Sequence, residues 1–336
     1  MKHPLISISI TVYNLEKYVG ACIESILNQE LTDFECIIID DGSSDRSGEI
    51  CRSYAQIDDR ITYIHQANQG VSAARNRAIE ESNGDYLLLA DGDDLLDPTM
   101  LKKLYALCKV NHADISTCLN RSVTEKDDRL FQTNINDEID YHIYTNEEAL
   151  TKLYSNELSG FGLCNKLYHR KLFKDVRFPF DRSFEDAAIQ YQLLYQANKI
   201  IFTEERLYYY RIHQDSLTRS QLIKFSHLRL DIIKNFEETM FYFKQNRVTS
   251  HVIDLILADY FRSLRGLIID LEKEEKSVQL IPLQIVTNQI RLWKDSFLSN
   301  PYLSKKELIF IWLWTHLPNL TSALYHIRNR FAIKEN

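Results

Sequence analysis

The most constraining feature of this 336-residue sequence is a short apolar run, residues 86–90, that ends in a dense group of carboxylates. The run has the length and composition of a strand buried on both faces. Three carboxylates follow it at once, those of Asp91, Asp93 and Asp94, and Gly92 stands among them. Carboxylates this close repel one another, so they need either solvent or a cation such as Mg²⁺ or Mn²⁺ that carries substrate phosphates. The stretch alone fits an acidic surface turn, capping the next helix, as well as it fits such a site.

Strand and helix patterns alternate along the first part of the chain. Runs typical of buried strands occupy residues 5–12, 34–39, 61–65 and 86–90. Stretches with the pattern of helices lie between them. One is at residues 15–29, one follows residue 45 and ends near residue 54, and one is at residues 71–81. Short loops join these segments, which predicts βαβ units and an α/β fold with a mostly parallel sheet.

Polar side chains follow three of these strands directly. They are Tyr13 and Asn14 after the first strand, Asp40 and Asp41 after the second, and Asp91 to Asp94 after the fourth. Ligands of such sheets bind beyond the carboxyl ends of the strands, so we expect one ligand site at this edge. The chain has neither a GxGxxG segment at its first helix nor a GxxxxGK[ST] segment, and neither a dinucleotide site nor a P-loop is therefore predicted.

The later part of the chain predicts a second domain. Helix patterns occupy residues 100–111, 147–155 and 185–197, strand patterns occupy 114–120 and 199–211, and a polar connection occupies 125–146. From about residue 221 the pattern changes to long amphipathic helices, at residues 222–245, 248–272 and 282–297. We therefore expect one domain at residues 1–220 and a helical C-terminal region at residues 221–336.

Composition argues against several classes of protein. The formal net charge of -7 argues against a nucleic-acid partner, because such proteins need a basic face. The six cysteines are scattered without a CxxC pair, so neither a zinc framework nor a disulfide scaffold is predicted. The sequence shows no signal peptide and no apolar run long enough to span a bilayer, and we expect a cytoplasmic location.

Four motifs, in the order found in family 2 glycosyltransferases, give residues 5–220 a resemblance to that family. They read Thr11-Val12-Tyr13-Asn14, Asp40-Asp41-Gly42-Ser43-Ser44-Asp45, Asn68-Gln69-Gly70-Val71-Ser72-Ala73-Ala74-Arg75-Asn76, and Gly84-Asp85-Tyr86 continuing to Asp94. The resemblance implies the GT-A fold, a Rossmann-like α/β fold that binds nucleotide-sugars, followed here by the helical region. It also implies an inverting, metal-dependent transfer of a sugar from a UDP-sugar donor to a saccharide acceptor.

The resemblance implies donor-binding roles for residues of the first two strands and the third helix. Thr11 and Tyr13 would lie against the uracil, and Asp40 or Asp41 would bond its polar edge. Arg75 would lie near the base or the diphosphate; the alternative is an arginine on a helix surface.

The resemblance also implies an Mn²⁺ or Mg²⁺ ion at the acidic stretch. Asp93 would be the main ligand, and Asp91 would approach either the ribose or the metal. Asp94 would be either a second ligand or the N-cap of the next helix. In a later motif, His213 would complete the coordination and Arg211 would steady the diphosphate, although a lone histidine is as readily structural.

Phe184-Glu185-Asp186 resembles the acidic pair that precedes a helix in this family, where one carboxylate is the catalytic base. Inversion at the anomeric carbon needs a group that takes the proton of the acceptor hydroxyl. The resemblance implies Asp186 for this role, with Glu185 as its orienter or its alternative; the competing interpretation is a pair that only caps the helix. Asn165 and Lys166, in another segment that resembles the family, would border the donor or acceptor site.

By resemblance, the setting would be bacterial surface polysaccharide synthesis on a lipid-linked acceptor. The absence of the membrane helices of processive synthases favours the addition of one sugar or a few. A glycoprotein acceptor, a nucleotidyltransferase and a catalytically silent nucleotide-sugar-binding scaffold are the alternatives. A nucleotidyltransferase would carry a Gly-rich basic loop after the first strand, which residues 11–16 lack, and intact Asp91, Asp93 and Asp186 argue against the scaffold.

The last segment, residues 304–336, predicts a helix over residues 308–331 that lies in a membrane interface. Its aromatic and basic residues include Trp312, Trp314, Tyr325, Arg328, Arg330 and Lys334. Such a helix is too short to span the bilayer, and it would make the protein peripheral on the inner face of the cell membrane. The alternative is a helix of the core or of a homo-oligomer interface.

Overall fold

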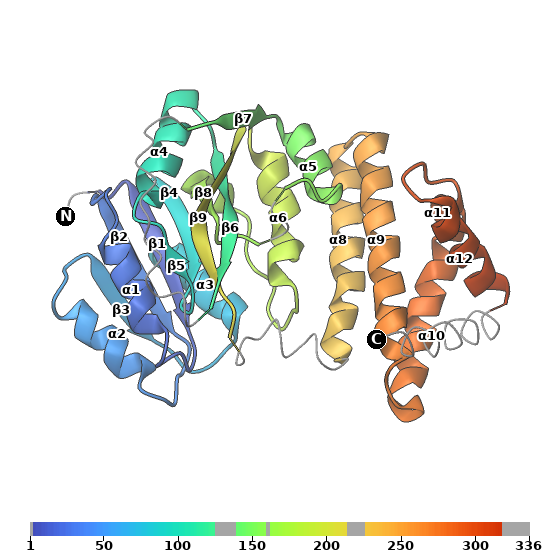
Figure 1. The fold of residues 1–336 in the computed structure, drawn as a ribbon, viewed down its shortest axis with the longest axis horizontal. Helices are drawn as coiled ribbons and strands as arrows, with labels where there is room; N and C mark the ends of the chain where they lie inside the picture. Colours follow the sequence, from blue (N-terminus) through green and yellow to red (C-terminus); the bar gives the residue numbers. More distant parts are fainter. Residues whose placement is uncertain (1–2, 125–138, 159–161, 214–225, 318–336) are drawn as a thin grey trace. The chain divides into compact units, whose positions relative to one another are not determined.

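The computed structural model describes residues 3–124, 139–158, 162–213 and 226–317 (Figure 1). The chain divides into two compact units, Met1–Gln214 and Asp215–Asn336. The domain boundary expected near residue 220 lies outside the described residues. All strands of the described residues belong to the first unit, and the second unit is helical.

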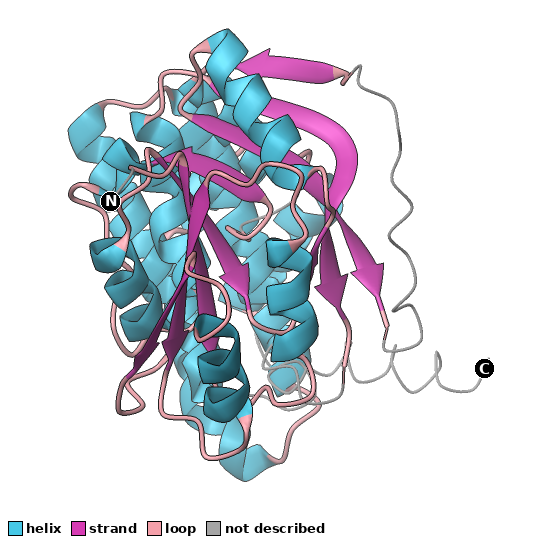
Figure 2. Cartoon of the chain, turned by 90° about the vertical axis from the view of Figure 1, so that its left-hand side faces the viewer, coloured by secondary structure: helices cyan, strands magenta, loops and turns pink. Residues whose placement is uncertain are grey.

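The first unit is built on a nine-stranded sheet with the order β3-β2-β1-β4-β8-β6-β9-β5, and β7 pairs with β9. The strands are β1 (Ile6–Val12), β2 (Phe34–Asp40), β3 (Ile61–His65), β4 (Tyr86–Asp91), β5 (Leu95–Leu96), β6 (Ile115–Val123), β7 (Tyr141–Tyr144), β8 (Lys166–His169) and β9 (Ile200–Arg211). From β3 to β4 the neighbours are parallel, and beyond β4 the sheet is mixed. Figure 2 shows the strands fanning apart, as in a twisted sheet.

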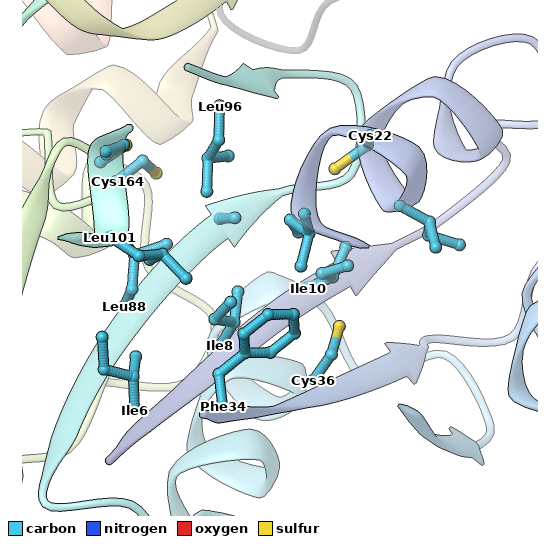
Figure 3. Packing of buried hydrophobic residues seen from close by; sticks show 14 of the residues in the cluster. Ile6, Ile8, Ile10, Cys22, Phe34, Cys36, Leu88, Leu96, Leu101 and Cys164 are labelled. Carbon is cyan, nitrogen blue, oxygen red and sulfur yellow. The ribbon is translucent and has the colours of Figure 1, made fainter. Parts of the chain in front are cut away.

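Helices cover both faces of the parallel part, because the strands there are apolar on both sides. On one face, the alternate isoleucines of β1 pack beneath α1 (Val19–Leu27) and α4 (Met100–Asn111) (Figure 3). On the other face, Ile37 and Ile39 of β2 pack against Ala74 and Ala78 of α3 (Val71–Glu81). Fully burying one such side chain contributes about 1.5–3 kcal/mol. The α/β fold expected from the sequence is thereby confirmed.

The remaining helices of the first unit lie mostly where their patterns predict them. They are α2 (Ser47–Ala55), α5 (Asn146–Tyr154), the short 3-10 helix η2 (Arg170–Phe173) and α6 (Glu185–Gln196). A capping box between Thr145 and Glu148 begins α5.

Three strands, β5, β7 and β8, were missed by the sequence patterns, and two of them, β5 and β7, pair with β9. The connection expected at 125–146 contains β7, which pairs antiparallel with β9, while residues 125–138 lie outside the description. β5 has only two residues, Leu95 and Leu96, and also pairs with β9. Both escape a local pattern because the twelve-residue β9 supplies their hydrogen-bonding partners from far along the chain.

The second unit contains the short 3-10 helix η3 (His227–Leu230), α8 (Asp231–Asn246), α9 (Ser250–Leu271), α10 (Lys276–Leu292), α11 (Lys294–Leu298) and α12 (Lys305–His316). Phe236 of α8 stacks on Tyr260 of α9, with ring centroids 3.6 Å apart. The helix expected from residue 282 begins earlier and contains Pro282, although proline costs a helix one hydrogen bond. None of the described helices is both long and apolar enough to cross a membrane.

Candidate active site

The carboxyl ends of β1 and β4 lie side by side, because Thr11 is the register partner of Asp91. Leu88 and Ala90 pack on the face covered by α1, so the side chain of Asp91 points to the opposite face, which α3 covers. There Oδ1 of Asp91 accepts a hydrogen bond from Nη2 of Arg75 at 2.9 Å, and Oδ2 accepts one from the Cys164 thiol at 3.2 Å. The pairing of β1 with β4 therefore places the Asp91 carboxylate at the start of residues 91–94, the acidic loop.

Arg75 brings three carboxylates together. Besides Asp91, it binds Oε1 of Glu185 at 2.6 Å and Oδ1 of Asp186 at 2.7 Å, both through Nη1. The arginine side chain is 5% exposed, so the helix-surface interpretation is wrong. A buried guanidinium needs charged partners of this kind. Whether Arg75 contacts a nucleotide stays a prediction.

Asp186 occupies the first turn of α6 beside this guanidinium. Burial raises the pKa of Asp186 to about 7; Arg75 lowers it, while Glu185 and Asp91 raise it further. Oδ2 of Asp186 has no hydrogen-bond partner among the described residues. The geometry therefore leaves one carboxylate oxygen able to accept a proton near neutral pH.

The end of β9 meets the acidic loop at Asp93. Nε2 of His213 lies 2.9 Å from Oδ2 of Asp93, and Nε of Arg211 donates to the backbone carbonyl of Asp93 at 2.9 Å. Burial and the charge of Asp91 raise the pKa of Asp93, against the effect of His213. The ring of Tyr18 lies 4.3 Å from that of His213, a contact that the sequence did not suggest.

Asp94 has a different environment from its two acidic neighbours. Its side chain is buried and accepts hydrogen bonds from the Tyr208 hydroxyl at 2.7 Å and from the backbone N–H of Arg211 at 2.8 Å. The expectation that Asp94 is the N-cap of the next helix is wrong, because Thr99 occupies that position in α4. Burial raises the pKa of Asp94 well above its ordinary value. Its two hydrogen bonds join the end of β9 to the loop.

The two carboxylates that follow β2 bind neighbouring loops. Asp40 accepts hydrogen bonds from the backbone N–H of Ser43 and from the Tyr63 hydroxyl, at 2.9 and 2.7 Å, and lies 3.0 Å from Nδ1 of His65. Burial raises its pKa, but these hydrogen bonds outweigh burial and leave the pKa lowered.

Asp41 accepts hydrogen bonds from the Gln66 side chain and from the backbone N–H groups of Gln69 and Gly70, and so orders the loop before α3. Tyr13, which directly follows β1, is 49% exposed. Contact of these residues with a uracil ring stays a prediction.

Asn165 and Lys166 lie in the segment that leads into β8, and both are buried. The Lys166 ammonium donates to the backbone oxygen of Gly162 and to Oδ1 of Asn165. Burial lowers the pKa of Lys166 to about 8. The Lys166 hydrogen bonds thus lie within this segment, whereas the Asn165 side chain donates to the backbone oxygen of Cys118 in β6. A direct contact of either residue with substrate stays a prediction.

A divalent cation fits the chemistry of the acidic loop. Asp91 and Asp93 supply carboxylate oxygens, and Nδ1 of buried His213 has no hydrogen-bond partner among the described residues. Within the same described ranges, no group of three or more His, Cys, Asp or Glu side chains is arranged to hold a metal. An ion here would therefore depend on further oxygens from a bound phosphate, as Mg²⁺ commonly does.

The model of the family described as glycosyl transferase family 2 matches residues 7–177. The glycosyltransferase GlyA of Streptococcus pneumoniae is 33% identical over 230 residues, which cover 67% of this chain and 33% of GlyA. The chain therefore spans only about a third of the length of that relative.

Two solved structures have the same fold. TarS 1–349 of S. aureus, in complex with UDP-GlcNAc, has a TM-score of 0.65 and 20% identity, with 88% of this chain and 81% of that chain covered. The mannosyltransferase PcManGT of Pyrobaculum calidifontis, in complex with GDP-Man and Mn²⁺, has a TM-score of 0.52 and 12% identity, with 97% and 88% covered. The GT-A fold with C-terminal helices is thereby confirmed. With its motifs in order and a family model over half its length, the chain belongs to glycosyl transferase family 2.

Proposed function

We propose that this chain is an inverting, metal-dependent glycosyltransferase that moves a sugar from a UDP-sugar to a hydroxyl group of a saccharide acceptor. The observation that carries the proposal is the cluster around Arg75, which joins Asp91 at the end of β4 to Glu185 and Asp186 at the start of α6. In this cluster Asp91, a carboxylate suited to bind the donor, lies beside Asp186, a carboxylate suited to accept a proton. Membership of the family supports the reaction class, and the UDP-GlcNAc bound to TarS supports a uridine donor.

On the donor side, we assign the uracil to the carboxyl ends of β1 and β2. The exposed ring of Tyr13 would stack on the base beside Thr11, and Asp40 or Asp41 would accept from its polar edge. Each of these two carboxylates already accepts protein hydrogen bonds, which fixes its orientation before a ligand arrives. Arg211 would steady the diphosphate.

On the acceptor side, Asp186 acts as the general base. The acceptor oxygen attacks the anomeric carbon as its proton passes to Oδ2 of Asp186, and the bond from that carbon to the diphosphate breaks. Attack opposite the leaving group inverts the anomeric configuration. Oδ1 of Asp186 is held by Arg75 throughout, so only the second oxygen changes its protonation.

Asp93, Asp91 and His213 would hold the Mn²⁺ or Mg²⁺ ion. When bound, such an ion supplies positive charge that stabilises the developing charge of the leaving diphosphate. The Mn²⁺ complex of PcManGT, which has the same fold, supports this assignment. The imidazole of His213, already 2.9 Å from Asp93, can act either as a ligand or as the group that orients this carboxylate.

For the setting, we propose bacterial surface polysaccharide synthesis on a lipid-linked saccharide in the cytoplasm. On α12 the side chains of Ile309 and Trp312 are 58% and 49% exposed, whereas Ile311 and Trp314 are buried. Exposed aromatic and apolar residues suit contact with a membrane surface. The rest of the expected helix, with Tyr325, Arg328, Arg330 and Lys334, lies outside the described residues.

Liposome co-sedimentation tests this membrane contact, with the whole chain compared with the double variant Ile309→Ser, Trp312→Ser. Binding that falls in the variant supports the contact. Equal sedimentation of both would favour a helix of the core or of a homo-oligomer.

The nucleotide assignment is tested by thermal unfolding with UDP, GDP, CMP or dTDP, each with Mn²⁺, Mg²⁺ or EDTA. A ligand that binds only the folded state raises the melting temperature. We expect stabilisation by UDP that requires the metal and is lost in Asp93→Ala. Stabilisation by another nucleotide would overturn the uridine assignment and keep the fold.

Donor hydrolysis separates an enzyme from a silent scaffold. We expect release of UDP from a UDP-sugar by the native chain and none by Asp93→Ala or Asp186→Asn. Arg77→Gln is a suitable control, because Arg77 is exposed on α3 and, among the residues that the structure describes, pairs with Glu81 of its own helix alone. A native chain that binds UDP without hydrolysis or transfer would favour the scaffold. Transfer to a protein-linked glycan in preference to a lipid-linked one would favour the glycoprotein acceptor.

A further inference from the structure

Two neighbouring residues of α3 reach the segment that leads into α6. Arg75 binds Glu185 and Asp186, as described above. Asn76 donates through Nδ2 to the carbonyl oxygen of Phe178, and its Oδ1 accepts from the N–H of the same residue, both at 2.9 Å. The guanidinium carbon of Arg75 also lies 5.3 Å from the centre of the Phe178 ring. One turn of α3 therefore contacts both ends of residues 178–186.

The backbone between these two contacts is strained. Asp181 and Phe184 have φ angles of 50° and 57°, in the left-handed region that side chains other than glycine rarely adopt. Phe184 is the residue directly before α6. Such conformations persist only where surrounding contacts maintain them. The contacts from α3 are suited to that task.

We propose that Arg75 and Asn76 are positioning residues, which hold the acidic pair of α6 beside Asp91 and act on the proton-accepting step rather than on the affinity for the donor. This inference rests on the proposed role of Asp186 as the base. Arg75 fixes Oδ1 of Asp186 and leaves Oδ2 for the acceptor hydroxyl. Asn76 fixes the backbone at Phe178, seven and eight residues before Glu185 and Asp186. It carries no charge and touches no proposed ligand of the donor.

The charges around Asp186 allow the effect of losing Arg75 to be measured separately from the effect of losing Asn76. The charged groups that face it are Arg75 of α3, Glu185 of α6, Asp91 of β4 and Lys166 of β8. The Cys164 thiol and the Tyr168 hydroxyl also lie near it, and burial raises the pKa of both. Arg75 is the cation hydrogen-bonded to Asp186 and lowers its pKa, so removal of Arg75 raises the pKa of that carboxyl above its native value of about 7. Loss of Asn76 changes no charge and leaves this pKa where it is.

The test compares Arg75→Gln, Asn76→Ala and the control Arg77→Gln, which removes the same charge from the exposed side of the same helix. We expect the Kd for UDP with Mn²⁺ to stay close to the control value in Asn76→Ala. In Arg75→Gln it should change far less than the rate, although Arg75 also contacts the proposed metal ligand Asp91. The maximal rate of transfer falls by about 100-fold in Arg75→Gln and by about 10-fold in Asn76→Ala, because the base is misplaced. The midpoint of the rate against pH moves upward in Arg75→Gln alone.

Two outcomes overturn the proposal. A Kd for UDP that weakens in step with the rate would make Arg75 a donor contact. An unchanged pH midpoint in Arg75→Gln, with full activity in Asn76→Ala, would remove the positioning role. A native chain that neither binds nor turns over a UDP-sugar contradicts the proposed function instead.

A second measurement does not depend on activity. Hydrogen–deuterium exchange of the whole chain should show faster exchange in residues 178–188 of Asn76→Ala and Arg75→Gln than in Arg77→Gln. Asn76→Ala keeps the buried charges paired, so it remains informative if Arg75→Gln does not fold. Equal exchange in that segment for Asn76→Ala and the control would show that α3 does not hold it.

Discussion

The hydroxyl group of Tyr208 donates a hydrogen bond to Oδ2 of Asp94 at 2.7 Å, across 114 positions of sequence. Both side chains are buried, at 1% exposure each. This contact joins β9 to the acidic loop that follows β4. It gives Asp94 a structural role beside the proposed metal-binding role of Asp93.

Tyr208→Phe should therefore destabilise the protein. The substitution removes one of the two donors to a buried carboxyl group, which costs about 1–3 kcal/mol of unfolding free energy. Urea unfolding at pH 7 measures this loss of unfolding free energy. Tyr210→Phe is the matched control, because the hydroxyl of half-buried Tyr210 makes no hydrogen bond to the described residues, and its effect should stay within about 0.5 kcal/mol. Equal midpoints for the two variants would contradict this role of Asp94.

The rate of transfer should rise with pH through about 7, where Asp186 loses its proton. Only the ionised carboxylate can accept the hydroxyl proton, so activity is low below this pH. Initial rates from pH 5 to 9 at saturating UDP-sugar measure the midpoint. A midpoint near 4, the ordinary range of an aspartate, would show that the base is another group or is more exposed.

The raised pKa of Asp186 also makes the free energy of unfolding depend on pH. The folded-state pKa of Asp186 is raised from 3.8 to about 7, so the native state binds this proton more tightly than the unfolded state. Its contribution to stability is present below about pH 4 and is lost as the pH rises through about 7. Asp186→Asn should abolish that dependence. Urea unfolding of the native chain and of Asp186→Asn at pH 5 and pH 8 measures this dependence. An equal change of unfolding free energy between the two pH values in both proteins would contradict the prediction.

His213→Ala should weaken metal binding without abolishing the fold. Whether His213 is a ligand or orients Asp93, its loss should raise the Mn²⁺ concentration needed for half-maximal stabilisation by UDP by about 10–100-fold. Thermal unfolding at fixed UDP and increasing Mn²⁺ measures the shift. His142→Ala is the control, since His142 is exposed on β7, which pairs with the opposite end of β9. An unchanged Mn²⁺ requirement would place the ion away from His213.

Gly92→Ala should disrupt the acidic loop. A Cβ at residue 92 would lie 2.8 Å from the backbone oxygen of Thr11 and 3.0 Å from a methyl carbon of Leu15, closer than real contacts allow. Gly266 is the control, because a Cβ there meets nothing within 4 Å in the middle of α9. Gly266→Ala should stabilise the chain by up to about 1 kcal/mol, whereas Gly92→Ala lowers both the melting temperature and the affinity for UDP. A tolerated Gly92→Ala would show that the loop has room to move.

Much of the fold and of the site chemistry was determined by the sequence alone. Strand periodicity placed β1 to β4, and carboxylates at the strand ends indicated where a ligand would bind, because both are local patterns. The acidic pair of α6 and the motif around Asp91 were likewise evident from neighbouring residues.

Only the tertiary structure decided how these parts meet. The antiparallel pairing of β8 with β4 sets Cys164 beside Asp91, and no local pattern predicts that register. Arg75 lies 110 positions from Glu185 in sequence, so its burial among carboxylates arises from the packing of α3 and α6 segments on the same sheet. Asp94 and Asp93 are neighbours in the same acidic run, yet one contacts Tyr208 and the other His213. Charge pattern is local, but burial and partner choice depend on segments far apart in the chain, and these decide what each carboxylate can do.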